Sequence, residues 1–120
     1  MNMLKMKRIY EGVTEGDGCR ILVDRLWPRG ISKEKAQLDY WEKEIAPTND
    51  LRKAFHSEQI DYETFKARYL EELKQNEAVP SFIELLRREQ AKGDVTLLFG
   101  AKNEMENQVT VLMEWLQDKL

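Results

Sequence analysis

Two largely apolar runs predict the centre of the fold. The first covers residues 20–26 and includes Ile21, Leu22 and Val23, and the second covers residues 95–99. Successive residues of a strand point to opposite faces, so a strand that is apolar throughout is buried on both of them. This pattern is typical of central strands in a parallel sheet. Residues 4–10 alternate loosely and carry lysines, which predicts an edge strand.

Apolar residues at helical spacing predict about five helices around these strands. Phe65, Tyr69 and Leu73, for example, follow one another at steps of four and form one stripe. The predicted helices are residues 37–45, residues 49–55 after an N-cap at Thr48, a helix capped by Asp61, residues 78–92, and residues 104–119. Strand, helices, strand and helix in this order indicate one α/β domain over residues 1–120 with a short, mostly parallel sheet.

Two further expectations concern connections and helix ends. No helix fits between residues 4–10 and 20–26, and a parallel crossover needs about a dozen residues or more. If these two strands are neighbours, we therefore expect them to be antiparallel. Asn103 and Glu106 fit the N-cap and N3 positions of a capping box at the start of the last helix.

Composition narrows the class of protein. The chain has 120 residues, the size of one ordinary domain, and 19 Lys and Arg against 22 Asp and Glu give a net charge of -3. This balance argues against nucleic-acid binding, which is usually marked by basic excess. A single cysteine, Cys19, excludes an internal disulfide and suits a reducing cytoplasm. No apolar run approaches the roughly 20 residues of a membrane helix. The oligomeric state is left open.

Polar side chains follow both central strands at the point where each one ends. Carboxyl ends of parallel strands meet at one edge of a sheet, where open α/β sheets bind ligands. Cations, backbone amides and an aromatic wall at this edge would suit a carboxylate or a phosphate. We therefore expect Arg52 to reach in from the predicted helix after Thr48. The other candidates at this edge are Asp24, Arg25, Trp27, Arg29, Gly100, Lys102 and Asn103.

Asp24 is the candidate catalytic residue, because burial near a strand end would raise its pKa toward that of a general base. Nearby arginines would lower the pKa again, which favours an ionised Asp24 that orients a ligand or holds the loops. The bland alternative is that Asp24 pairs with Arg25, Arg29 or Arg52 and that Trp27 belongs to the core. Both interpretations remain open from the sequence.

Signatures of better-known chemistry are missing. The chain has no GxxxxGK phosphate loop, no dinucleotide fingerprint, no HExxH and no CxxC. Cys19 precedes the first central strand and so lies at the opposite end of the sheet from the candidate site. His56 is the only histidine, which argues against zinc, and it stands at a helix end, where the dipole would favour its charged form. We expect no metal, and no cofactor is indicated.

The run LVDRLWPRG, residues 22–30, followed by Ser32 and Lys33, resembles the YeaO-like family of bacterial proteins, which carries a domain of unknown function. The likeness covers nearly the whole chain. Further matching segments are Trp41, Ala46-Pro47-Thr48, Leu51-Arg52, Phe55, Phe65, Arg68-Tyr69, Glu72-Leu73, residues 95–99, Ala101-Lys102 and Asn107.

The resemblance implies a small cytoplasmic α/β protein without an established activity. It also implies one shared set of polar residues, which maps onto Asp24, Arg25, Arg29, Lys33, Arg52, Lys102 and Asn107. The chain departs from the family at Glu106, where many relatives carry histidine. The broader superfamily often has a Cys-His-Arg run where this chain has Glu106-Asn107-Gln108, so cysteine or metal chemistry does not carry over.

Two functional hypotheses follow. The first is a protein that binds a small anionic molecule at the carboxyl edge of the sheet, with or without turnover. The second is a non-catalytic interaction module or scaffold that docks a partner protein. A ligand site requires a concave pocket with converging cations, whereas a docking surface requires Trp27 or Trp41 on an exposed, flat patch.

Overall fold

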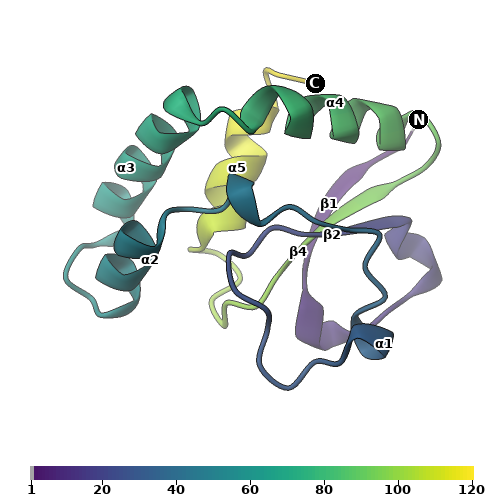
Figure 1. The fold of residues 1–120 in the computed structure, drawn as a ribbon, viewed down its shortest axis with the longest axis horizontal. Coiled ribbons are helices and arrows are strands. Elements are labelled where there is room, and N and C mark those ends of the chain that lie inside the picture. Colours follow the sequence, from purple (N-terminus) through teal and green to yellow (C-terminus); the bar gives the residue numbers. More distant parts are fainter. Residues whose placement is uncertain (1) are drawn as a thin grey trace.

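A four-stranded parallel sheet with the strand order β1-β4-β2-β3 lies at the centre of the fold (Figure 1). The structure is a computed structural model that describes residues 2–120. The strands are β1 (Leu4–Arg8), β2 (Cys19–Leu22), β3 (Tyr40–Trp41) and β4 (Val95–Phe99). The helices are α1 (Lys33–Ala36), α2 (Asn49–His56), α3 (Tyr62–Gln75), α4 (Val79–Gln90) and α5 (Gln108–Leu116). The predicted α/β class and the parallel sheet are confirmed.

The two central strands are buried on both faces, as their sequences predict. Ile21 and Leu97 belong to the larger core on one face, which the helices α2 to α5 cover. Leu22 and Leu98 face the smaller core on the other side, which includes Ala36 of α1. The helices α4 and α5 contact β4 directly, α3 packs on α5, and α2 packs on α3. In Figure 1, α2 to α5 lie above and to the left of the strands, and α1 lies below them.

The first two strands are separated in the sheet by β4. β1 is an edge strand, as predicted, but its neighbour is β4, with Leu4 beside Val95 and Arg8 beside Phe99. β4 also pairs with β2, and both pairings are parallel. β1 and β2 are therefore not neighbours, and the antiparallel pairing expected only for neighbouring strands does not arise. Two short 3₁₀ turns, Ile9–Glu11 and Glu15–Asp17, carry the chain past β4.

The predicted helix over residues 37–45 is wrong. Tyr40 and Trp41 form β3, which extends the sheet beside Ile21 and Leu22, and Lys43–Ile45 is a 3₁₀ turn. Asp39 fixes this strand, because its carboxylate accepts the N–H of Arg20 at 2.8 Å and its own N–H donates to the carbonyl of Arg20 at 2.9 Å. Leu38 and Ile45 pack into opposite cores, so their helical spacing reflects no shared face.

Several predicted boundaries also shift. The strand predicted over residues 20–26 ends at Leu22, although the N–H of Val23 still bonds to β4 through the carbonyl of Leu98 at 3.1 Å. The short helix α1, absent from the prediction, begins after Ser32. Thr48 and Asp61 cap α2 and α3 as predicted. Within residues 2–120, no helix is both long enough and apolar enough to span a membrane.

The predicted capping box at Asn103 and Glu106 is also wrong. The N-cap of α5 is Asn107, whose side-chain oxygen accepts the N–H groups of Val109 at 2.8 Å and Thr110 at 3.0 Å. Asn103 instead caps the preceding turn, in which its side chain accepts the N–H of Glu106 at 2.9 Å. Both asparagines can cap, and the buried one sits directly before the apolar repeat of the helix.

Candidate functional site

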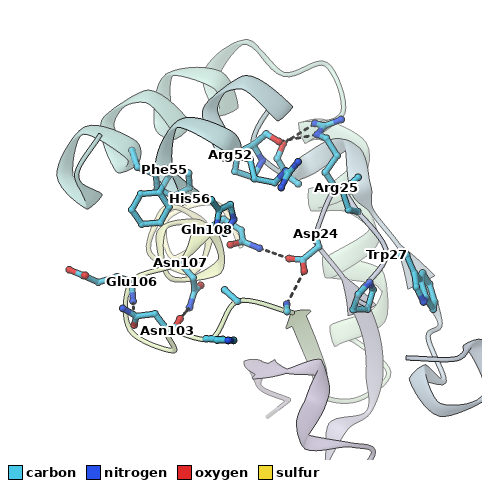
Figure 2. A pocket seen from close by; sticks show the side chains of 18 residues that line it. Asp24, Arg25, Trp27, Arg52, Phe55, His56, Asn103, Glu106, Asn107 and Gln108 are labelled. Carbon is cyan, nitrogen blue, oxygen red and sulfur yellow. Dashed lines mark hydrogen bonds between the residues drawn. The ribbon is translucent and has the colours of Figure 1, made fainter. Parts of the chain in front are cut away.

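A cavity of about 550 Å³ opens at the carboxyl edge of the sheet (Figure 2). Four chain segments meet there: residues 24–28 after β2, residues 46–47 before α2, α2 itself, and residues 100–108 between β4 and the first turn of α5. Phe65 of α3 adds to its wall. The sequence predicts a site at this edge, because parallel strands bring their carboxyl ends together. The volume suits a small organic molecule.

Asp24 lies just after β2 and bonds to the segment of residues 100–108 that follows β4. One carboxylate oxygen accepts the backbone N–H of Gly100 at 2.8 Å, and the other accepts the side-chain amide of Gln108 (Figure 2). Burial raises the pKa of Asp24 to about 6, against the opposing effect of these two hydrogen bonds and of the positive charge on Arg52. The predicted rise by burial therefore exceeds the predicted fall from nearby arginine. Arg25, Arg29 and Arg52 form no ion pair with Asp24.

Arg52 and His56 reach the cavity from one face of α2, one turn apart. The Nε–H of Arg52 is buried and has no hydrogen-bond acceptor among residues 2–120. Burial, together with the charge of Arg52, lowers the pKa of His56, so its imidazole is mostly neutral at pH 7. This opposes the dipole effect that its place at a helix end suggested. Arg52 is thus the cation of α2 that meets the cavity.

The segment after β4 supplies the opposite rim. Lys102, Asn103 and Glu106 line the cavity and are solvent-exposed. Lys102 therefore adds an exposed positive charge, and Glu106 adds a negative one. Asn103 is committed to the turn, since its side chain caps Glu106 and its carbonyl accepts the side-chain amide of Asn107 at 2.8 Å.

Arg25 and Trp27 of the LVDRLWPRG run line the cavity, but both are hydrogen-bonded within the protein. Arg25 donates to the carbonyls of Pro47 at 2.9 Å and Ala46 at 3.0 Å, so its guanidinium ties the loop before α2 to the end of β2. Trp27 donates to the carbonyl of Ile31 at 2.6 Å and stands edge-on to Trp41, with ring centres 5.3 Å apart. Arg25 is therefore a structural cation, and Trp27 is both wall and core.

Two predicted site residues do not line the cavity. Arg29 is exposed, and its backbone carbonyl accepts the hydroxyl of Tyr10 at 2.8 Å. Lys33 is exposed at the start of α1, on the other side of the sheet. Asn107 does line the cavity, but its side chain is buried and used to cap α5. The structure thus brings together Asp24, Arg25, Trp27, Arg52, Lys102 and Asn107, and leaves Arg29 and Lys33 apart.

Several residues that shape the cavity were not predicted from the sequence. Phe55 and Phe65 form a stacked pair with ring centres 4.4 Å apart, and both line it. The sequence marks both residues as buried apolar positions of helices, but it does not show that they border a cavity. Gln108 was missed because no motif surrounds it, and its role follows only from where α5 begins.

The described residues support neither a metal site nor cysteine chemistry at this cavity. Within residues 2–120 there is no group of three or more His, Cys, Asp or Glu side chains that could hold a metal ion. Cys19 lies at the amino end of β2, away from the cavity, as predicted. Burial raises the pKa of its thiol to about 12, with Asp39 and Glu89 adding to the effect.

These features define a small α/β protein with a largely apolar cavity at the carboxyl edge of a parallel sheet. Residues 3–120 match a family model described as the inactive DUF488-N3 subclade, and the chain belongs to this YeaO-like DUF488 family. The uncharacterised protein YeaO of Escherichia coli K12 is 47% identical over 114 residues, which cover 95% of this chain and 96% of YeaO.

Mycobacterial proteins are more distant relatives. The uncharacterised protein Rv3073c of Mycobacterium tuberculosis H37Rv is 31% identical over 116 residues, covering 97% of this chain and 95% of its own. The uncharacterised protein Mb3100c of Mycobacterium bovis matches equally well, at 31% over 116 residues and with the same coverage. No solved structure matches the chain.

Proposed function

We propose that this protein binds a small organic anion in the cavity at the carboxyl edge of its sheet and releases it unchanged. The observation that carries the proposal is the buried Nε–H of Arg52, which lines the cavity and has no acceptor among residues 2–120. A buried donor without a partner costs about 1–3 kcal/mol, and a ligand carboxylate or phosphate would remove that cost.

Lys102 strengthens the same interaction from the opposite rim of the cavity. Its ammonium group forms no ion pair within residues 2–120, and its exposed position lets it close over a bound anion. Arg25 holds the loop before α2 through two carbonyls and so keeps the wall in place. Arg29 and Lys33 stand outside the proposed site, because neither lines the cavity.

Binding without turnover fits the chemistry of the lining. No Ser, Thr, Cys or Tyr is among the described residues that line the cavity, so no hydroxyl or thiol is available for covalent catalysis. Both oxygens of Asp24 are held by neutral donors, which suits a carboxylate that orients a ligand better than a general base. The description of the matching family model as inactive points the same way.

The setting of the protein is part of the same proposal. A single, half-buried cysteine suits a reducing cytoplasm. The net charge of -3 makes a nucleic acid a poor ligand, because the phosphate backbone would be repelled overall. We therefore expect a small molecule of the cytoplasm to occupy the cavity.

The alternative of a docking surface around the tryptophans has less support. Trp27 lines a cavity and donates its indole N–H inside the protein. Trp41 is 36% exposed, but its indole N–H donates to the carbonyl of Asp24 at 2.7 Å, and the Lys43 ammonium lies over its ring. Both rings thus make contacts within the protein, which favours the cavity over a docking patch.

Thermal unfolding in the presence of an anion panel tests the proposal. The panel contains inorganic phosphate, acetate, benzoate and 3-phenylpropionate, with sodium chloride as the ionic control. A compound held at about 100 times its Kd should stabilise the native state by about 2.7 kcal/mol, which raises Tm on the order of 10 °C for a domain of this size. The Arg52→Gln variant should lose most of this shift.

Lys53→Gln is the matched control, because Lys53 is exposed on the same helix and does not line the cavity. It should keep the shift. Equal loss in both variants would mean that general charge, and not the cavity, attracts the anion. Bound compounds are then recovered after long incubation and compared with the starting material by NMR. Chemical conversion by the wild-type protein would overturn the non-catalytic part of the proposal.

A further inference from the structure

Asp24 and Arg52 carry opposite charges into one cavity without neutralising each other. The charge on Arg52 lowers the pKa of Asp24, so the two groups are close enough to interact. They nevertheless form no ion pair, and within residues 2–120 neither side chain has an ion-pair partner of opposite charge. A buried charge is normally paired, because leaving water is costly. The cavity thus has a negative pole and a positive pole, each incomplete.

The negative pole is the more unusual of the two. Asp24 accepts hydrogen bonds from the backbone N–H of Gly100 and the amide of Gln108, and both donors are neutral. Each carboxylate oxygen has a second lone pair, so Asp24 can accept a further bond from a cationic donor. An ammonium group inside the cavity would provide both the missing donor and the missing charge.

The walls between the poles are apolar. The stacked rings of Phe55 and Phe65 lie on one side, and Pro28, Pro47 and Ala101 contribute further apolar surface. Such walls favour a hydrocarbon or aromatic group and disfavour a sugar or a bare phosphate, whose polar groups would lose their water without new partners.

From this arrangement, and resting on the proposed function, we infer that the ligand is a zwitterion with an apolar side chain, the chemistry of an apolar amino acid. Its carboxylate is bound by Arg52, with Lys102 closing over it. Its ammonium group donates to Asp24, and its side chain packs between the phenylalanines and prolines. Asp24 is then a specificity-determining residue for the amine.

Two matched series of compounds test this inference by isothermal titration calorimetry on the wild-type protein at pH 7.5. The first is L-phenylalanine, 3-phenylpropionate and 2-phenylethylamine, and the second is L-leucine, 4-methylpentanoate and 3-methylbutylamine. A charge-assisted hydrogen bond contributes about 1.5–3 kcal/mol, so removal of either charged group should weaken binding about tenfold or more. The amino acid should bind most tightly in at least one series.

The Asp24→Asn variant separates the two poles, since asparagine keeps the size of the side chain and an acceptor for Gly100. It should bind the amino acid no better than the deaminated acid, while affinity for the deaminated acid should be equal to or higher than that of wild type, because a negative charge beside the bound carboxylate has been removed. Arg52→Gln should weaken both acids. Circular dichroism and thermal unfolding establish that each variant is folded.

The outcomes are distinct. If the deaminated acid binds wild type as tightly as the amino acid, the proposed anion site stands and the zwitterion inference is overturned. If phosphate binds and neither carboxylate series does, the zwitterion inference is likewise overturned, and the cavity binds an anion but not the organic anion proposed. If no anion of either panel binds the wild-type protein, both the inference and the proposed function fail. The wild-type measurements alone decide the matter should Asp24→Asn fail to fold.

Discussion

The backbone N–H of Gly100 donates a 2.8 Å hydrogen bond to the carboxylate of Asp24, which lies 76 positions earlier in the sequence. This bond joins the segments that leave the two central strands and sets the floor of the cavity. A Cβ atom added at Gly100 would lie 3.1 Å from the same carboxylate oxygen. The residue after β4 therefore has to be small if the carboxylate is to keep its position.

Gly100→Ala should push the Asp24 carboxylate away and lengthen its bonds to Gly100 and Gln108. Because a hydrogen bond to a charged group contributes about 1.5–3 kcal/mol, we expect a loss of about 1 kcal/mol or more in the free energy of unfolding, measured with urea. Gly93→Ala is the matched control, since a Cβ there meets nothing within 4 Å. Equal stability of the two variants would show that the close approach is harmless.

The stability of the protein should depend on the protonation of Asp24. Its pKa is raised by burial to about 6 from an ordinary 3.8, so the folded state binds this proton more tightly than the unfolded state. The native state is therefore stabilised as pH falls from 6 to 4, and the ionised form costs about 3 kcal/mol above pH 6.

Asp24→Asn removes this titration, so the difference in unfolding free energy between wild type and variant should change by about 2 kcal/mol between pH 7.5 and pH 4.5. The free energy of unfolding of the wild type should rise relative to that of the variant as pH falls. Urea unfolding across this range measures the difference, and a carbon NMR titration of the Asp24 carboxyl measures its pKa directly. A midpoint near 4 would contradict the expectation.

Gly18 holds a backbone position that no other residue fits. Its φ is +65°, and an added Cβ would lie 2.1 Å from the carbonyl oxygen of Asp94, so the clash involves the main chain. We expect Gly18→Ala to be severely destabilised or unfolded. Gly30→Ala isolates the cost of positive φ, because Gly30 has φ +80° with nothing within 4 Å of an added Cβ, and it should lose only about 1 kcal/mol. Thermal unfolding compares the two.

A buried charge cluster fixes the same turn to the sheet. Asp17 and Arg20 are 4% and 3% exposed, and Arg20 donates to the Asp17 carboxylate at 2.5 Å. Asp17→Asn leaves Arg20 buried without its counter-charge, which should cost about 3–5 kcal/mol. A second change, Arg20→Met, should restore part of that loss in urea unfolding. If the double variant is no better than the single one, the charge pair is not the cause.

The pH dependence of this cluster has the opposite sign to that of Asp24. Burial by itself would raise the pKa of Asp17, but hydrogen bonds from Thr14, Lys7 and Arg20 outweigh it and hold the pKa well below its ordinary value. The stabilisation is complete above about pH 4 and is lost as the pH falls further. Acid unfolding of wild type below pH 4 should therefore be steeper than that of Asp17→Asn.

Sequence patterns were sufficient for the parts of the fold that follow periodicity. The central strands could be predicted because burial on both faces leaves little room for polar residues, as Ile21 and Leu22 illustrate. The parallel sheet then placed Asp24 and Lys102 at one edge. β3 could not be predicted, since two residues form no pattern and Asp39, a single polar side chain, fixes the pairing.

The remaining errors concern which polar side chains form hydrogen bonds within the protein and which do not. Arg25 and Arg52 look alike in the sequence, but Arg25 is held by two carbonyls whereas Arg52 has a buried donor left over. Arg29 is exposed and does not line the cavity, and only the path of the loop after β2 determines this. The choice between Asn103 and Asn107 as the helix cap likewise depends on which one the fold buries.

The strand order has a consequence for how the protein is made. β4, which is residues 95–99, lies between β1 and β2, so these two early strands do not pair with each other. A nascent chain on the ribosome cannot complete its sheet until this late segment has emerged, and the contacts that then form span most of the sequence. Until that moment the apolar faces of β1 and β2 remain open to chaperones and to aggregation.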